Sequence, residues 1–123
     1  MTVILIVCVA LFFLAMGGMG ILSPARILAI FKVELKTHEG RNEVRAVYGG
    51  YGLAMSGILF FSLSAPSLRA GILVCVAVAM LGMALGRLIS FLIERQTSFY
   101  PLLFLAVEIM LAFTLFAAFS LPG

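Results

Sequence analysis

Four long apolar stretches, separated by short polar turns, dominate this sequence. They cover residues 2–22, 44–63, 70–92 and 101–121. One helix needs about 20 apolar residues to cross the hydrocarbon layer of a bilayer. In that layer every backbone N–H and C=O must be hydrogen-bonded within the protein, which a helix achieves on its own. The sequence therefore predicts an all-α, integral membrane four-helix bundle, formed by a single transmembrane domain over residues 1–123.

The composition excludes several classes of function. Hydrophobic residues make up 64% of the chain and charged residues only 11%, whereas a soluble domain is about half apolar and a quarter charged. The net charge of +3 is small and falls mainly in the connections, so it does not indicate nucleic-acid binding. It indicates contact with lipid headgroups and a preferred orientation in the membrane.

Lysine and arginine are distributed unequally between the two sides of the predicted bundle. The first and third connections contain Arg26, Lys32, Lys36, Arg41 and Arg95, and Arg45 and Arg87 lie close to them. The opposite side contains only Arg69. Because cytoplasmic loops carry an excess of lysine and arginine, we predict that these two connections are cytoplasmic and that both termini are outside.

The segment after the first apolar stretch is amphipathic. Ser23 and Pro24 are typical of a helix N-cap and of the first helical position. The apolar side chains that follow share one helical stripe: Ile27, Ile30, Phe31 and Leu35. Two arrangements fit this pattern, a short helix in the headgroup plane or a bent continuation of the first helix. Further along the chain, Asn42 is the predicted N-cap of the second spanning helix.

Two charged residues fall inside the spanning stretches. Arg87 and Glu108 each lie about two helical turns, or about 10 Å, from the cytoplasmic ends of their spans. A charge at this depth costs on the order of 3 kcal/mol or more unless it is paired or hydrated. We therefore predict a buried ion pair between these two residues. Tyr48 or Arg45 would complete its hydrogen bonds, and Glu43 lies just above.

Many glycines fall in the cytoplasmic halves of the predicted spans. These are Gly17, Gly18, Gly49, Gly50, Gly52, Gly82 and Gly86. Gly82 and Gly86 form a Gly-x-x-x-Gly motif, which is typical of close contact between membrane helices. Two interpretations remain open for the whole set: the glycines allow tight helix packing, or they line a narrow polar cavity entered from the cytoplasm.

Sequence motifs of enzymes and cofactor sites are absent. Cys8 and Cys75 are not part of a C-x-x-C motif, which argues against a disulfide oxidoreductase. His38, the one histidine, stands beside Glu39 in a polar turn, without further metal ligands in the pattern. We therefore expect no metal, no cofactor and no catalytic residue, and an enzyme is the less favoured interpretation.

The second span contains the motif N-E-V-R-A-V-Y-G-G-Y-G, Pro24 follows the first span, Gly86-Arg87 stands late in the third, and the fourth contains Glu108. With these features the chain resembles a family of small bacterial four-helix membrane proteins of unknown function. The resemblance implies four helices and a bacterial inner (plasma) membrane location, and it implies no activity. The matching positions form the predicted binding site: Glu43, Arg45, Tyr48, Gly49, Gly50, Arg87 and Glu108.

Three classes of function fit this pattern. The first is a non-catalytic binding or accessory protein whose polar pocket holds a lipid headgroup or another amphiphile. The second is a small proton-coupled transporter that uses Glu108, although a carboxylate already paired with arginine is a poor cation exchanger. The third is a lipid-modifying enzyme with Glu108 or Glu43 as acid or base, for which no nucleophile or metal set is visible. We favour the first, and we expect a homodimer or a membrane-protein partner because four thin helices leave little interior volume.

Overall fold

A computed structural model describes residues 1–96 and 98–121, and the regular elements within these residues are all helical. Four helices are long and apolar enough to cross a membrane. They are α1 (Thr2–Leu22), the continuous run of α3 (His38–Val44), η1 (Arg45–Gly50) and α4 (Tyr51–Ser64), α5 (Pro66–Glu94), and α6 (Phe99–Ser120). A short helix, α2 (Pro24–Ala29), follows α1. The predicted all-α fold with four membrane-competent helices is confirmed.

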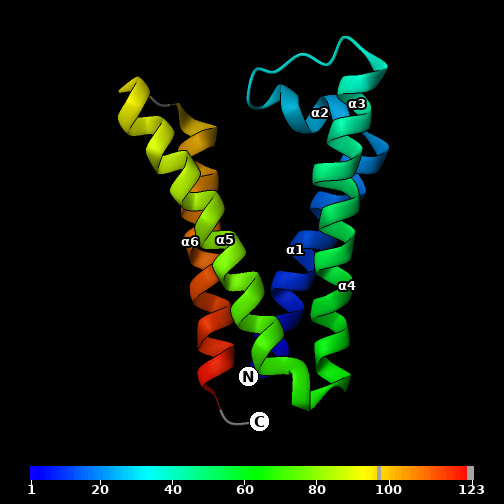
Figure 1. Cartoon of the computed structure of the whole chain (residues 1–123), viewed down its shortest axis with the longest axis vertical. Helices are drawn as coiled ribbons and strands as arrows, with labels where there is room; N and C mark the ends of the chain where they lie inside the picture. The colour runs from blue at the N-terminus through cyan, green and yellow to red at the C-terminus, as the bar shows by residue number, and fades with distance from the viewer. Residues whose placement is uncertain (97, 122–123) are drawn as a thin grey trace.

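The long helices form two antiparallel pairs that are arranged as a V (Figure 1). The most extensive contacts join α5 to α6 and α1 to α4, and α1 also contacts α6. The pairs meet at the end of the molecule where α4 turns into α5 and where the N-terminus lies. They diverge toward the other end, where α2 and the segment after it lie across the opening (Figure 1). The two helix pairs are therefore close together at one end of the bundle and apart at the other end.

The apolar core fills the closed end of the V. Its buried members come from all four long helices: Ile6, Val9, Ala10, Phe13, Leu59, Leu73, Val76, Ala77, Met80, Leu111, Ala112, Leu115 and Ala118. Many large apolar side chains point outward instead, for example Leu11 and Phe113, which are 51% and 66% exposed. Outward apolar side chains suit helices surrounded by lipid, where burial of an apolar face provides no driving force.

Close backbone contact joins α1 to the π-helical and following turns of the second long helix. A Cβ atom added at Gly17 would lie 2.6 Å from the backbone nitrogen of Leu53, and one added at Gly20 would lie 2.6 Å from the backbone nitrogen of Gly49. Gly52 lies equally close to α1, since its added Cβ would be 2.8 Å from the Cα of Gly17. Of the two interpretations of the glycines, tight packing therefore holds for this group.

The Gly-x-x-x-Gly motif of α5 behaves differently. A Cβ atom added at Gly82 or at Gly86 would meet no atom of residues 1–96 and 98–121 within 4 Å, and both residues are exposed. Of the two interpretations of the glycines, tight packing against another helix of this chain therefore does not hold for this motif. The reason is that α5 turns its opposite face, which carries Leu73, Val76 and Met80, toward the core.

The connection between α1 and the second long helix contains a separate short helix. Ser23 ends α1 with a non-helical backbone (φ −141°, ψ 64°), and Pro24 occupies the first turn of α2. Of the two arrangements that fit the sequence, the bent continuation is therefore excluded. The new helix stops at Ala29, well before the end of the amphipathic pattern. Lys32, with φ 61°, adopts the left-handed conformation that non-glycine residues seldom adopt.

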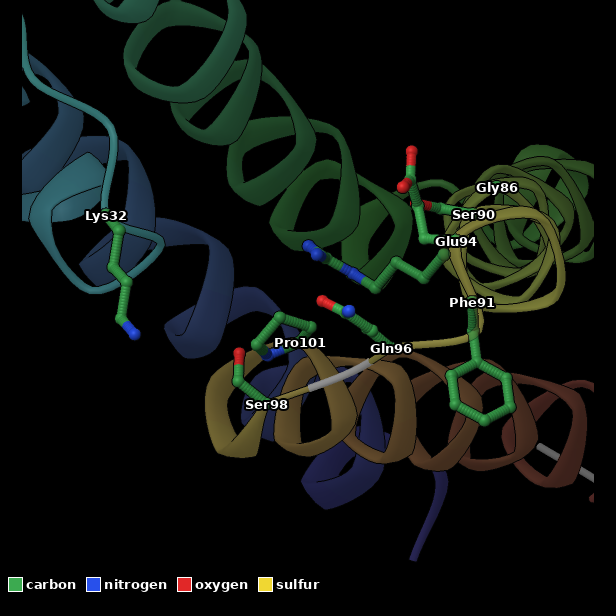
Figure 2. A pocket seen from close by; sticks show the side chains of 9 residues that line it. Lys32, Gly86, Ser90, Phe91, Glu94, Gln96, Ser98 and Pro101 are labelled. Atoms are coloured by element: carbon green, nitrogen blue, oxygen red, sulfur yellow. The ribbon is translucent and has the colours of Figure 1, made fainter.

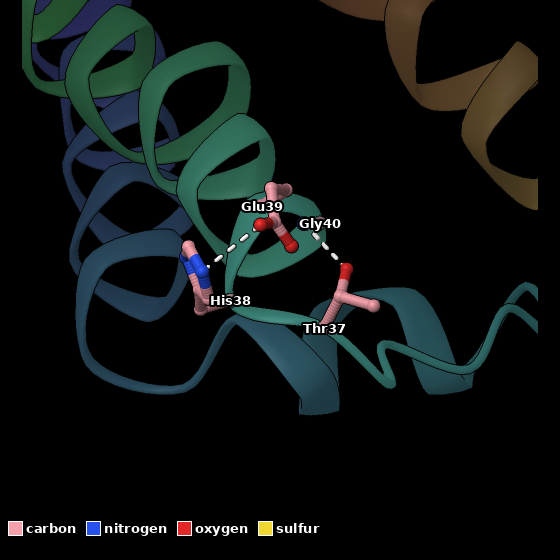
Figure 3. Close-up of polar contacts among 4 residues, drawn as sticks. All are labelled: Thr37, His38, Glu39 and Gly40. Atoms are coloured by element: carbon pink, nitrogen blue, oxygen red, sulfur yellow. Dashed lines mark hydrogen bonds and ion pairs between the residues drawn. The ribbon is translucent and has the colours of Figure 1, made fainter.

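The second long helix begins earlier than the sequence predicts. Its N-cap is Thr37, whose Oγ1 accepts a hydrogen bond from the backbone N–H of Gly40 at 3.1 Å (Figure 3). His38 and Glu39 are in contact in the same turn, with 2.9 Å between Nε2 and Oε1. The prediction of Asn42 as N-cap is wrong. Thr37 caps the helix more than one helical turn earlier, so the polar segment between the two residues is itself helical.

Candidate functional site

Arg87 of α5 and Glu108 of α6 form an ion pair between the two antiparallel helices. The Nε of Arg87 donates to Oε1 of Glu108 at 2.7 Å. The Glu108 side chain is only 3% exposed and that of Arg87 is 22% exposed. A buried carboxylate is tolerated when a hydrogen-bonded cation compensates its charge. This pair therefore places a charged group in a mainly apolar interior.

Two aromatic rings cover the guanidinium group of Arg87. Its Cζ atom lies 5.2 Å from the ring centroid of Phe31 and 5.7 Å from that of Phe104. The two rings are also in contact, with 5.2 Å between their centroids. Cation–π contacts of this kind stabilise a cation that is removed from water. Phe31 belongs to the turn after α2, so this contact fastens the connection onto the ion pair.

A small apolar cavity lies beside the ion pair and between the two halves of the V. Its volume is about 40 Å³, and Tyr48, Arg87 and Glu108 are the polar residues of its lining. The second carboxylate oxygen of Glu108, Oε2, is buried without a hydrogen-bond partner among the described residues. The cavity is about large enough for one water molecule or for the end of a small group.

A larger polar cleft lies on the outer side of Arg87, at the open end of the V. Its volume is about 710 Å³. Figure 2 shows the side chains around it, which come from the connection after α2, the end of α5 and the start of α6: Lys32, Gly86, Arg87, Ser90, Phe91, Glu94, Gln96, Ser98 and Pro101. Arg87 lines both this cleft and the small apolar cavity. The cleft therefore connects the ion pair with the surface.

The predicted site residues fall into two places. Tyr48 lies beside Arg87 and Glu108 in the lining of the small cavity, and it makes no hydrogen bond to the pair within residues 1–96 and 98–121. Arg45 instead donates from Nε to the carbonyl oxygen of Ile21 at 3.0 Å, which caps the last turn of α1. The prediction that Tyr48 or Arg45 completes the hydrogen bonds of the pair is therefore wrong for both residues within the described part of the chain.

The remaining predicted residues also lie away from the pair. Glu43 is exposed on α3. Gly49 is buried against Ile21 of α1, and Gly50 has only its own helix near it. Both glycines belong to the π-helical turn η1, and such turns are rare and frequently occur at functional sites. Here the wide turn forms the glycine contact with α1 and carries Tyr48.

Sequence reasoning missed the aromatic cover and the wall of the cleft. Phe31 was visible on the apolar stripe of the amphipathic segment, but its position over Arg87 depends on where the connection folds back. Phe104 had no signal that separated it from the other apolar residues of its span. The sequence places Lys32 and Glu94 in two separate connections and gives no sign that they share a site. Only the V-shaped arrangement of the helices brings the two connections to one cleft.

The described residues offer no metal site of the usual kind. Within residues 1–96 and 98–121, no group of three or more His, Cys, Asp or Glu side chains is placed to hold a metal ion. Cys8 and Cys75 are free thiols on the exposed faces of α1 and α5. The charged side chains of the cleft are suited to hold a charged group beside an apolar surface.

The sequence profile of DUF4345, described as a domain of unknown function, matches residues 1–119. The chain belongs to this family. The matched range of the DUF4345 domain contains the ion pair, both cavities and the glycine contact. No curated protein and no solved structure matches the chain. Membership therefore agrees with an uncharacterised role and assigns no activity.

Proposed function

We propose that this protein is a non-catalytic binding or accessory protein of the inner membrane, and that its polar cleft holds the headgroup of a lipid or other amphiphile. The observation that carries the proposal is the position of Arg87. This residue lines a polar cleft that reaches the surface, and it is held on its inner side by Glu108. A cation fixed in this way is held in one orientation and is largely removed from water, with its side chain 22% exposed.

The donors of Arg87 support an anionic group as part of the ligand. Only its Nε is engaged with Glu108, and the terminal nitrogens have no hydrogen-bond partner within the described residues. The guanidinium fork matches the oxygens of phosphate or carboxylate groups. Lys32 adds a second cation to the lining of the same cleft. The two cations come from different elements, so a ligand would bridge the connection after α2 and α5.

The surroundings of the cleft support an apolar tail. Phe91 and Pro101 belong to its lining, and the adjoining side chains Leu92 and Leu102 are 63% and 46% exposed. Ligand sites usually combine apolar walls with a few charged or polar groups that fix orientation. An amphiphile could therefore place its charged group in the cleft and its chains along α5 and α6.

The other two classes of function have less support. Transport by Glu108 would require its carboxylate to exchange partners, but Oε1 is bound to Arg87 and the side chain is nearly fully buried. A lipid-modifying enzyme would need a nucleophile or an activated water at the cleft. Its lining offers serine hydroxyls and Glu94, and the described residues contain no cluster of side chains that could hold a metal ion.

A charge substitution in the cleft tests the proposal. We expect Lys32→Gln to weaken the binding of phosphate-bearing lipids about fivefold, since one lysine near a membrane surface contributes about 1 kcal/mol to attraction of anionic lipid. Native mass spectrometry of the detergent-solubilised protein, titrated with defined phospholipids, measures this. Lys36→Gln is the matched control, because Lys36 lies on the same connection outside the cleft and contacts Glu34. Equal weakening by both substitutions, or by neither, would contradict the proposal.

The orientation in the membrane remains a second proposal, based on the unequal distribution of lysine and arginine. We propose that both termini are outside and that the cleft opens to the cytoplasm. A topology reporter fused after Gly123 is expected to score as external, and one inserted before His38 as cytoplasmic. An internal reporter at Gly123 would reverse the orientation and would place the cleft on the outer surface.

A further inference from the structure

Glu94 places a negative charge in the cleft that holds the two cations. It is the last residue of α5 and is exposed. Among the described residues the ion pairs are Lys36–Glu34, His38–Glu39 and Arg87–Glu108, so neither Lys32 nor Glu94 is paired. Figure 2 shows Lys32 and Glu94 on opposite sides of the cleft. The cleft therefore presents one free positive and one free negative charge to a ligand.

The charges of the cleft restrict the kind of headgroup that it accepts. Arg87 and Glu108 compensate each other, which leaves Lys32 and Glu94 as the charges to be matched. A purely anionic headgroup would bring negative charge toward Glu94, and a purely cationic one would bring positive charge toward Lys32. Like charges at short range are disfavoured. A headgroup that carries both charges avoids both penalties.

The helix ends favour the same polarity. Glu94 ends α5, and the last carbonyl groups of a helix form the negative end of its dipole, which attracts cations. Ser98 and Pro101 stand at the beginning of α6, which is the positive end of the helix dipole and favours negative charge. In Figure 2 the Lys32 side chain points toward the side of the cleft where Ser98 and Pro101 lie. One side of the cleft is thus suited to phosphate and the other to ammonium.

We infer that the ligand is a zwitterionic amphiphile of the phosphoethanolamine type, and that Glu94 determines this specificity. The phosphate group binds Lys32 and the terminal nitrogens of Arg87, and the primary ammonium group binds the carboxylate of Glu94. The cleft volume of about 710 Å³ lies within the range of small-ligand sites. This inference rests on the proposed function and adds the class of ligand to it.

The test compares headgroups on one protein. Native mass spectrometry measures binding of phosphatidylethanolamine, phosphatidylglycerol and phosphatidylcholine with identical acyl chains. We expect the parent to prefer phosphatidylethanolamine to both others, because glycerol carries no cation and choline carries no N–H donor. Glu94→Gln is expected to reduce the preference for phosphatidylethanolamine over phosphatidylglycerol about threefold, the size of an exposed ion pair. Binding of phosphatidylglycerol should be retained or improved.

A matched control and a soluble ligand complete the experiment. Glu34→Gln removes an exposed carboxylate outside the cleft and should leave the preference unchanged. Water-soluble glycerophosphoethanolamine should bind more weakly than the lipid, and equally tight binding would overturn the lipid assignment. A parent without preference, or a Glu94→Gln variant that keeps the full preference, would overturn the inference while lipid binding itself persists. Absence of any phospholipid binding by the parent would overturn the proposed function as well.

Discussion

Replacement of Glu108 alone by leucine is expected to destabilise the protein by about 3–5 kcal/mol, which is the usual effect of removing one partner from a buried ion pair. Arg87 would keep its charge in an apolar interior, with its Nε no longer bound. The Arg87→Leu variant should be affected in the same direction, because the Glu108 carboxylate is only 3% exposed. The double replacement should recover most of the loss, since two apolar side chains can substitute for a buried pair.

Thermal unfolding followed by circular dichroism, together with the yield of monodisperse protein, measures these effects. Glu43→Leu is the matched control, because Glu43 is exposed and forms no ion pair within the described residues. It should melt close to the parent. If both single variants of the pair also melt like the parent, the ion pair does not stabilise the fold. If the double variant is destabilised by the sum of the two single effects, the two side chains act independently of each other.

The second large effect is expected at the glycine contact between α1 and the π-helical turn. Gly20→Ala should destabilise the protein by about 1–3 kcal/mol, the usual cost of overpacking. The new Cβ would lie 2.6 Å from the backbone nitrogen of Gly49 and 2.8 Å from its Cα. A backbone cannot rotate away as a side chain can, so α1 would have to move from η1. That movement would also disturb Tyr48, which η1 carries.

Gly18→Ala provides the comparison for this prediction. Gly18 lies on the same helix only two residues away, but a Cβ atom added there would meet no atom of the described part of the chain within 4 Å. Alanine is favoured over glycine inside a helix by about 1 kcal/mol, so this variant should be as stable as the parent or more stable. The difference in melting temperature between the two variants isolates the helix contact. Equal stability of both variants would contradict the close packing.

Local sequence signals were sufficient for the helical architecture. The four apolar stretches predict four helices because every backbone N–H and C=O in the hydrocarbon layer must be hydrogen-bonded within the protein, and a helix achieves this within a single segment. The sequence also indicated that Arg87 and Glu108 lie at one level. They flank a short turn at nearly equal distances along two antiparallel helices, and the constant rise of a helix converts equal counts of residues into equal depth.

The second long helix shows where local signals were not sufficient. Thr37 and Asn42 are both good N-cap residues, and the sequence offers no local criterion between them. The structure selects Thr37, so that the polar turn continues the helix. Similarly, every glycine in the spans is equally compatible with close contact, yet Gly20 packs on a neighbouring backbone and Gly82 on none.

The site itself was decided by tertiary structure. The sequence by itself determined which residues carry charge and how deep they lie along each helix. It did not determine the rotation of α5, which turns Gly82 and Gly86 outward, or the path of the connection that brings Phe31 over Arg87 and Lys32 opposite Glu94. Rotation and path depend on contacts between segments far apart in the chain. Such contacts follow from the packing of whole helices, which no local pattern of residues records.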